Sequence, residues 1–437
     1  MINTDLCYAA TSDGNSNSET NPPTWERIAV YPPQIELRGL RGSMRLVVVG
    51  YDAHGRGVDL TRHASYRTVD ERIVRMERTV VHAVTNGDTG IAVTVDGLEQ
   101  TVPVQVVDAE LSSPISFRHE TVPALTSLGC NAGKCHGAPK GKGLFRLSLL
   151  ASNIELDKAT LTRETFGRRT NVIQPENSLI LRKPTMQVQH GGGLRLRKHD
   201  PAYVVLKQWI SEGCKTDEPD APACQKIEIY PPAGHILQPS RPTQQILVVA
   251  HYDDGSTRDV TALSQFRSSD DRLARIAANG LVTAHHRGEV AMVVRYGQQV
   301  SSQAMTVVDD VHEFAWPDPP VNNYIDELVY NKLQQLRFVP SDITSDEEFL
   351  RRVSLDVTGR FPSIARVESF LADQSPDKRS VLIDQLLESP DYAQFWALKW
   401  GDLLSLKQDL LSEQGLRKYY DWLVRSWESN QPFDEFC

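Results

Sequence analysis

The sequence predicts a multidomain protein in which two all-β sandwiches flank a mainly helical module, with an all-α domain after them. Three observations lead to this fold class. The chain has 437 residues, which is too many for a single hydrophobic core. A β-rich segment of about 80 residues near the N-terminus recurs about 200 residues later, which indicates two copies of one domain. From Asn322 onward, apolar residues at helical spacing replace the alternating pattern.

The repeat occupies residues 25–109 and 225–310. Ile-Ala-Val-Tyr-Pro-Pro at 28–33 returns as Ile-Glu-Ile-Tyr-Pro-Pro at 227–232, and both copies end in Val-Val-Asp. Within each copy, short alternating apolar runs are separated by turn residues. This pattern is typical of an antiparallel β-sandwich.

The turn and strand pattern at 254–276 makes the repeat resemble bacterial Ig-like domains of group 2. The first copy departs from that pattern, with His54-Gly55 where the family has Asp-Gly, but it keeps the same frame. The resemblance implies two Ig-like domains that act as spacers or adhesive modules. It implies no site residues in either copy.

The strongest chemical motif is Cys-Asn-Ala-Gly-Lys-Cys-His-Gly at 130–137. Covalent haem attachment requires two cysteines ending in Cys-His, because the thiols of Cys130 and Cys135 add to the haem vinyl groups and His136 binds the iron. The usual signature has two residues between the cysteines, whereas this one has four. Three interpretations remain open: covalent haem c, a site that has lost haem and holds only a disulfide, and zinc bound by Cys130, Cys135, His136 and His190.

The segment around this motif, residues 117–216, is predicted to be mainly helical. The expected elements are a short helix at 123–129, a glycine turn with an alternating apolar run at 141–149, and helices at 155–166 and 201–213. Residues 163–200 contain eight basic residues and three acidic ones. This local basic patch could hold haem propionates or dock an acidic redox partner. We expect His119 and His199 to be surface residues and not ligands.

Phe-Arg-Leu at 145–147, Pro-Glu-Asn-Ser-Leu at 175–179 and Leu-x-x-Trp-Ile-x-x-Gly at 206–213 make this segment resemble the cytochrome c-like module of large planctomycete surface proteins. The resemblance implies a haem with His136 as the proximal ligand. Where that family usually offers a Met, this chain has His190, with Met186 four residues earlier. We expect His190 to be the distal ligand and Met186 the second choice. A bis-His iron has a lower potential than a His/Met one, because a thioether favours the reduced metal.

The C-terminal segment, residues 320–437, is predicted to be all α. Its pattern, Leu-Arg-Arg-x-x-Leu-Asp-x-Thr-Gly-x-x-Pro at 350–362, resembles the helical domain of unknown function that follows the cytochrome-like module in the same planctomycete proteins. That domain has no established activity and extends beyond the point where Cys437 ends this chain, so we expect an incomplete domain. We expect Arg351, Arg352 and Asp356 to form a buried ion-pair network.

Composition and motifs also exclude classes of function. The net charge of −9 leaves no overall basic surface for nucleic acid, so no nucleic-acid partner is expected. No apolar run is long enough for a transmembrane segment. Residues 1–24 are polar, with no visible signal peptide, and we expect a disordered leader.

The six cysteines are too few for a disulfide scaffold, and Cys214 and Cys224 are either one bridge or two free thiols.

No hydrolase, nucleotide-binding or metalloprotease motif occurs, which favours a protein without substrate turnover of its own. The sequence therefore predicts a secreted, periplasmic or cell-surface electron-transfer protein with a c-type haem. Its partner would be a redox protein or a cell-envelope polymer. The alternative is a non-enzymatic envelope or adhesion scaffold whose cytochrome-like module lacks haem.

Overall fold

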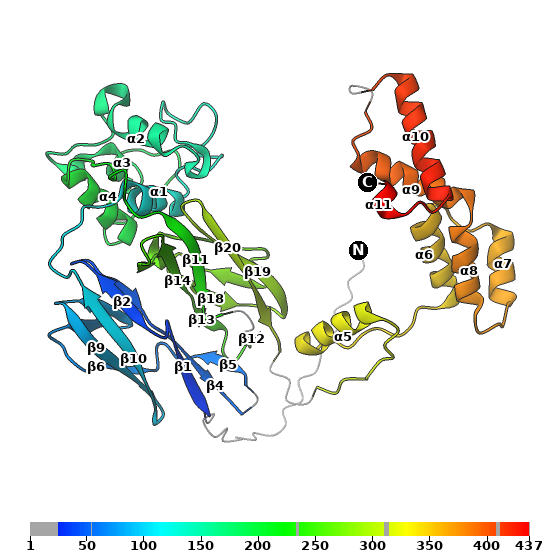
Figure 1. The fold of residues 1–437 in the computed structure, drawn as a ribbon, viewed down its shortest axis with the longest axis horizontal. Helices are drawn as coiled ribbons and strands as arrows, with labels where there is room; N and C mark the ends of the chain where they lie inside the picture. Colours follow the sequence, from blue (N-terminus) through cyan, green and yellow to red (C-terminus); the bar gives the residue numbers. More distant parts are fainter. Residues whose placement is uncertain (1–24, 54, 233–235, 310–313, 408–410, 437) are drawn as a thin grey trace, which may run out of the picture. The chain divides into compact units, whose positions relative to one another are not determined.

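The computed structural model describes residues 25–53, 55–232, 236–309, 314–407 and 411–436. The expected leader, residues 1–24, lies outside the described residues. The chain divides into two compact units, one ending at Val339 and the other beginning at Pro340. The first unit contains two β-sandwiches separated by a small helical region, and the second is all α, so the fold class is confirmed at this level (Figure 1). None of the described helices combines the length and apolar character needed to cross a membrane.

Sandwich 1 is built from the first copy of the repeat. Its strands are β1 (Arg27–Tyr31), β2 (Ile35–Arg38), β3 (Ser43–Arg45), β4 (Val47–Tyr51), β5 (Gly57–Asp59), β6 (Ser65–Thr68), β7 (Val74–Glu77), β8 (Val80–Ala83), β9 (Gly87–Val95) and β10 (Leu98–Val107). They form one four-stranded sheet, β2-β10-β9-β6, and two three-stranded sheets, β1-β4-β5 and β3-β8-β7. Along β10, Val102, Val104 and Val106 are buried while their neighbours are exposed, so the period of two in the sequence places one face of the strand in the core.

Sandwich 2 repeats this arrangement. Its strands are β11 (Cys224–Tyr230), β12 (Ile236–Leu237), β13 (Thr243–Gln245), β14 (Leu247–Tyr252), β15 (Thr257–Asp259), β16 (Gln265–Ser268), β17 (Ala274–Ile276), β18 (Leu281–Ala284), β19 (Gly288–Tyr296) and β20 (Gln299–Val307). The sheets β12-β20-β19-β16, β11-β14-β15 and β13-β18-β17 have the same strand order as their counterparts in sandwich 1. A short 3₁₀ turn at Thr261–Leu263 follows β15. The sequence repeat is therefore a structural repeat.

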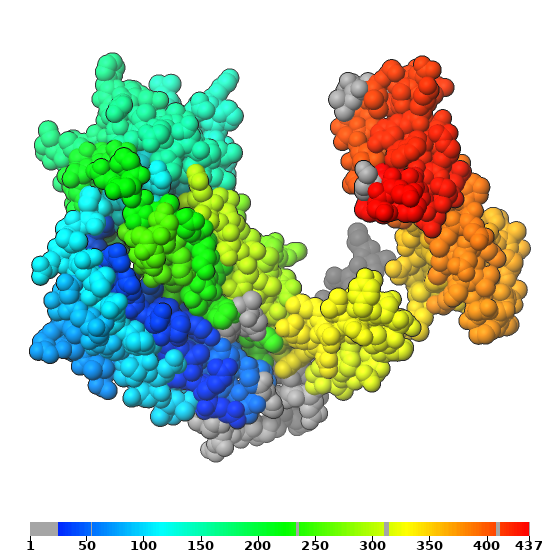
Figure 2. Space-filling view, in the orientation of Figure 1, coloured from blue at the N-terminus to red at the C-terminus, as the bar shows by residue number. Residues whose placement is uncertain are grey.

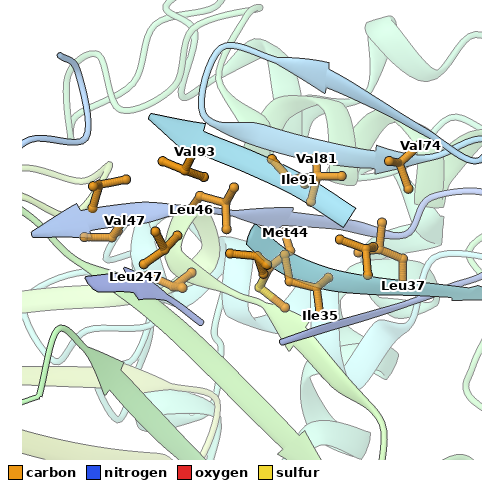
Figure 3. Packing of buried hydrophobic residues seen from close by; sticks show 14 of the residues in the cluster. Ile35, Leu37, Met44, Leu46, Val47, Val74, Val81, Ile91, Val93 and Leu247 are labelled. Atoms are coloured by element: carbon orange, nitrogen blue, oxygen red, sulfur yellow. The ribbon is translucent and has the colours of Figure 1, made fainter. Parts of the chain in front are cut away.

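The two sandwiches pair through equivalent surfaces. The carboxylate of Asp59 accepts a hydrogen bond from the backbone N–H of Gln245 at 2.6 Å, and that of Asp259 accepts one from the N–H of Arg45 at 3.1 Å. Because these residues occupy matching places in the two copies, the contact has the reciprocal form of a two-fold interface. Leu247 of β14 joins the core of sandwich 1, where Figure 3 shows it near Val47. The pairing joins the two sandwiches within the first unit.

The central module, residues 117–216, connects the two sandwiches in sequence. It consists of a π-helical turn (Phe117–Thr121), α1 (Val122–Ser127), a 3₁₀ turn (Leu149–Ala151), α2 (Ile154–Thr162), further 3₁₀ turns (Glu164–Gly167 and Pro175–Asn177), α3 (Leu179–Arg182) and α4 (Pro201–Ser211). The predicted helix at 155–166 is too long, because Thr165 and Phe166 adopt left-handed φ angles of 53° and 60°. The alternating run at 141–149 forms no strand, since Leu144 has a φ of 58° and only an isolated bridge joins Lys142 to Phe145.

Both sandwiches contact the start of the central module. Arg41 of sandwich 1 makes an ion pair with Glu120 at 2.6 Å, and the Tyr296 hydroxyl of sandwich 2 donates to the carbonyl of His119 at 2.5 Å. Figure 2 shows the cyan and green surface of the module meeting the green and yellow-green surface of sandwich 2. The prediction that His119 is a surface residue is therefore wrong. Its side chain is 9% exposed, with the ring edge against Tyr252. His199 is exposed, as predicted.

Helix α5 (Tyr324–Leu336) belongs to the first unit, where Lys332 makes an ion pair with Glu289 of sandwich 2. The second unit contains α6 (Asp346–Thr358), α7 (Ile364–Ala372), α8 (Lys378–Leu387), α9 (Pro390–Leu403), α10 (Glu413–Glu428) and α11 (Phe433–Phe436). The segment is all α, as predicted from the sequence.

The predicted buried ion-pair network in α6 is wrong. Arg351, Arg352 and Asp356 are all exposed, and Arg352 makes only a surface pair with Glu348 at 3.9 Å. The buried face of the helix instead carries Leu350, Ser354 and Thr358, which recur at intervals of four residues. The charges lie on the opposite side, where water solvates them at lower cost than a protein core would.

Candidate functional site

The loop that carries the Cys-His motif begins directly after α1. The backbone N–H of Cys130 donates to Leu125 at 3.0 Å, and the N–H of His136 donates back to the carbonyl of Cys130 at 2.9 Å. The four residues between the cysteines therefore fold into a compact loop that returns to its own start. A Cβ on Gly137 would lie 2.0 Å from the carbonyl oxygen of Asn131, so only glycine allows this close approach.

A cavity of about 660 Å³ opens beside this loop. Four of the five residues predicted for the site line it: Cys130, Cys135, His136 and His190. The fifth, Met186, does not line it and is 47% exposed. The structure thus brings together residues up to 60 positions apart in the sequence and leaves Met186 outside.

Both histidines are held by the same kind of hydrogen bond. The Nδ1 atom of His136 lies 3.1 Å from the carbonyl of Phe145, and the Nδ1 atom of His190 lies 2.9 Å from the carbonyl of Gly193. A carbonyl only accepts, so each Nδ1 carries a proton, and in a neutral ring the lone pair is then on Nε2. Histidines that ligate a metal usually donate their second ring N–H in this manner.

The charge state of His136 agrees with this role. Burial lowers the pKa of the His136 imidazole, and the nearby His190 lowers it further, while the Phe145 carbonyl acts in the opposite direction. The ring is therefore neutral at neutral pH, which is the form that binds a metal.

The two rings are arranged as a pair. Their centroids are 6.4 Å apart and their planes differ by 16°. One metal ion bound by both Nε2 atoms, at the usual metal–imidazole bond length of about 2.0 Å, keeps two such centroids roughly 6 Å apart. The measured separation of the His136 and His190 centroids, 6.4 Å, is close to this value.

The protein alone does not provide a complete metal site here. Within the described ranges, no group of three or more His, Cys, Asp or Glu side chains lies close enough to hold a metal ion. The structure therefore gives no support to a zinc site made of Cys130, Cys135, His136 and His190. Two imidazoles can serve as the protein ligands of a cofactor that brings four nitrogens of its own, as a haem does.

The cysteines of the described chain are free. Cys130, Cys135, Cys214 and Cys224 form no disulfide, so of the two interpretations of Cys214 and Cys224 the structure has the free thiols. Burial, assisted by the neighbouring Cys135, raises the pKa of Cys130 to about 12 and keeps it protonated. Cys214 is buried in the core of the central module, while the Sγ of Cys224 lies 3.6 Å from the carbonyl of Lys226.

The cavity lining combines apolar and cationic side chains. Its apolar members are Leu125, Leu128, Leu144, Phe145, Leu179, Ile180 and Pro184, and its cationic members are Lys134, Lys142, Arg168, Arg169, Lys183 and Arg195. No Asp or Glu occurs in this lining among the described residues. The basic patch expected from the sequence supplies four of the six cations; Lys134 and Lys142, which lie outside 163–200, were missed.

Gly192 is a third site residue that the sequence did not indicate. A Cβ at this position would lie 2.8 Å from Cε1 and 3.2 Å from Nε2 of His190. The run of three glycines at 191–193 was the sequence feature that could have indicated this role, but it did not show which of the three contacts His190. Only the tertiary contact identifies Gly192 as the residue that leaves room for the His190 ring.

Replacing Gly192 with alanine is expected to displace the His190 ring and to alter its hydrogen bond to Gly193, because the new methyl group would overlap the imidazole. Imidazole ¹⁵N chemical shifts of His190 in the purified protein measure this. Gly191→Ala is the matched control, since a Cβ there meets nothing within 4 Å. Equal effects of the two substitutions would contradict the contact.

Comparison with known proteins adds one family match. Residues 324–437 match the family described as PSCyt2, protein of unknown function (DUF1549). No curated protein matches the sequence. The matching segment contains α5 and the helices of the second unit, and lies outside the candidate site.

Among solved structures, domains 5–6 of the S-layer protein SbsC align with a TM-score of 0.29 at 12% identity, covering 66% of this chain and all 100% of that one. Domains 4–9 of SbsC align with a TM-score of 0.28 at 12% identity, covering 66% of this chain and 32% of that one. The Yersinia pseudotuberculosis adhesin InvE aligns with a TM-score of 0.16 at 8% identity, covering 67% and 60%. At TM-scores this low, these matches carry no functional inference.

Proposed function

We propose that the central module is a c-type haem domain that transfers single electrons. The thiols of Cys130 and Cys135 would hold the haem through thioether bonds, and His136 and His190 would bind its iron. The bound haem supplies a one-electron iron couple. The observation that carries this proposal is the pair of near-parallel imidazoles, 6.4 Å apart, in a cavity that both cysteines line.

The remaining lining suits the same group. The apolar side chains suit the face of a macrocycle, and around a bound haem they would lower the local polarity, which would influence its reduction potential. The cations are able to bind two propionates without competition from a carboxylate in the lining. Two imidazole ligands give a lower potential than an imidazole and a thioether, so we expect a low-potential electron carrier.

The rest of the chain then acts as a support. The two sandwiches are Ig-like spacers that hold the haem domain at the cell surface, in the envelope or in a secreted particle, where it meets a redox protein or an envelope polymer. Two sets of contacts support a fixed position of the module on the sandwiches. The sandwiches pair reciprocally through Asp59 and Asp259, and Arg41 and Tyr296 contact the module. No catalytic role is assigned to the helical second unit.

The test is expression of the full chain together with a c-type cytochrome maturation system. We expect Soret and α absorption bands and a haem that stays with the protein through acid-acetone extraction. The double variant Cys130→Ala/Cys135→Ala is expected to lose the covalent haem while keeping the same secondary structure by circular dichroism. A wild-type chain that folds but acquires no covalent haem would overturn the proposal in favour of a non-enzymatic envelope scaffold.

A further inference from the structure

We propose that Arg169 is a positioning residue for His136, acting through the turn at Leu144 and Phe145. This inference rests on the proposed function only for its effect on a bound haem. Its effect on the imidazole of His136 is a property of the protein by itself.

Phe145 makes two contacts with His136. Its carbonyl accepts the Nδ1–H at 3.1 Å, and its ring centroid lies 4.5 Å from the imidazole centroid with an angle of 46° between the planes. The first contact selects the tautomer that leaves Nε2 free, and the second limits rotation of the ring. The orientation of His136 therefore depends on where Phe145 lies.

Phe145 has little support from secondary structure. It belongs to no strand or helix, and its only ladder contact is the isolated bridge to Lys142. Leu144 before it is 85% exposed and has a left-handed φ of 58°. A turn of this kind is free to shift unless another group fixes it.

Arg169 is that group. Its side chain is buried, and its guanidinium donates to three backbone carbonyls: from Nη2 to Leu144 at 2.5 Å, and from Nη1 to Thr160 at 2.9 Å and Glu164 at 3.2 Å. The guanidinium carbon lies 4.8 Å from the Phe145 ring centroid, within the range of a cation–π contact. The planar guanidinium of Arg169 thus connects the turn before Phe145 to the end of α2. A lysine ammonium does not reproduce these hydrogen bonds, because it is a single point charge on a flexible side chain.

The charge of Arg169 acts on the same site. Arg169 lines the cavity, and its guanidinium donates to backbone carbonyls and not to a carboxylate among the described residues. A fixed positive charge beside a haem disfavours the ferric state relative to the ferrous state, because the ferric iron carries one more positive charge. Arg169 therefore raises the reduction potential of a haem held here, in addition to orienting its ligand.

The first experiment uses the full chain made without haem. In ¹⁵N-labelled wild-type protein above pH 7.5, the His136 imidazole is expected to show the shift pattern of the Nδ1–H tautomer. Arg169→Met and Arg169→Lys are both expected to shift it toward a mixture of tautomers, because neither side chain holds all three carbonyls. Arg163→Met, which removes an exposed arginine outside the cavity, is the control. A His136 pattern unchanged in both Arg169 variants would overturn the inference, provided their amide spectra remain folded.

The second experiment uses the haem-loaded chain and separates charge from geometry. Arg169→Met is expected to lower the midpoint potential, and Arg169→Lys to recover part of that loss, since it keeps the charge. Arg163→Met is expected to leave the potential unchanged. If the wild-type chain takes up no haem, the proposed function fails but the tautomer result still decides the role of Arg169. Equal potentials in wild type and Arg169→Met would contradict the charge effect.

Discussion

His190→Ala is expected to convert the haem-loaded protein from a six-coordinate, low-spin form to a five-coordinate, high-spin form. The reason is that His190 lines the cavity together with His136 and has its Nδ1 hydrogen-bonded to the carbonyl of Gly193 at 2.9 Å, so that its Nε2 would be the second imidazole ligand of the iron. Removal of this ring leaves one axial position without a protein ligand. The change is measured from the shift and broadening of the Soret band and from electron paramagnetic resonance of the ferric protein.

Met186→Ala is the matched control for this prediction. Met186 lies four positions before His190 but is 47% exposed and does not line the cavity. We therefore expect its spectrum and midpoint potential to equal those of the wild type. Loss of the low-spin spectrum in Met186→Ala, with retention in His190→Ala, would reverse the assignment of the distal ligand.

Trp209→Ala is expected to destabilise the central module by about 3–5 kcal/mol, the usual cost of removing a buried aromatic ring. Trp209 is fully buried, stacks on Phe117 with ring centroids 5.2 Å apart, and donates from Nε1 to the carbonyl of Lys215 at 2.9 Å. Its removal leaves a large cavity at the centre of the module and an aromatic ring without its partner. The opening free energy from hydrogen exchange of the α4 amides measures the loss, since unfolding of a multidomain chain is not a single two-state transition.

Trp209→Phe separates the ring from its hydrogen bond. It keeps an aromatic partner for Phe117, so we expect a smaller cost of about 1–3 kcal/mol. The carbonyl of Lys215 keeps a second donor, the ammonium group of Lys158 at 2.7 Å, and is not left unpaired. Amides of β19 in sandwich 2 serve as the internal reference and are expected to keep their protection. Equal losses in β19 and α4 would mean that the module is not a separate cooperative unit.

Several features follow directly from residue patterns. The recurrence of Tyr-Pro-Pro and of the closing Val-Val-Asp predicted two copies of one domain, and the strand orders agree. The buried positions of α4, among them Leu206, Trp209 and Ile210, follow from helical spacing. These succeed because local periodicity alone decides which face of an element becomes apolar.

Other residues gave no usable signal in the sequence. His119 has no apolar pattern around it that indicates burial, and it is buried where Tyr252 and Tyr296 of sandwich 2 contact the module. Arg351, Arg352 and Asp356 were expected to be buried because their charges suggested a network, whereas the helix period places them on the solvent face. Periodicity was the better guide in α6 than residue chemistry.

The sequence by itself determined the order of the domains, the repeat, the Cys-His motif and the candidate pair of histidines, because each depends on residues that are close in sequence or recur at a fixed offset. The tertiary structure decided which of His190 and Met186 lies on the cavity, which atoms hold the two imidazoles, and that Gly192 and Arg169 support them. Those features depend on backbone carbonyls and close approaches between distant segments. A carbonyl is present at every residue, so only the folded chain distinguishes Phe145 and Gly193 as acceptors for the two histidines.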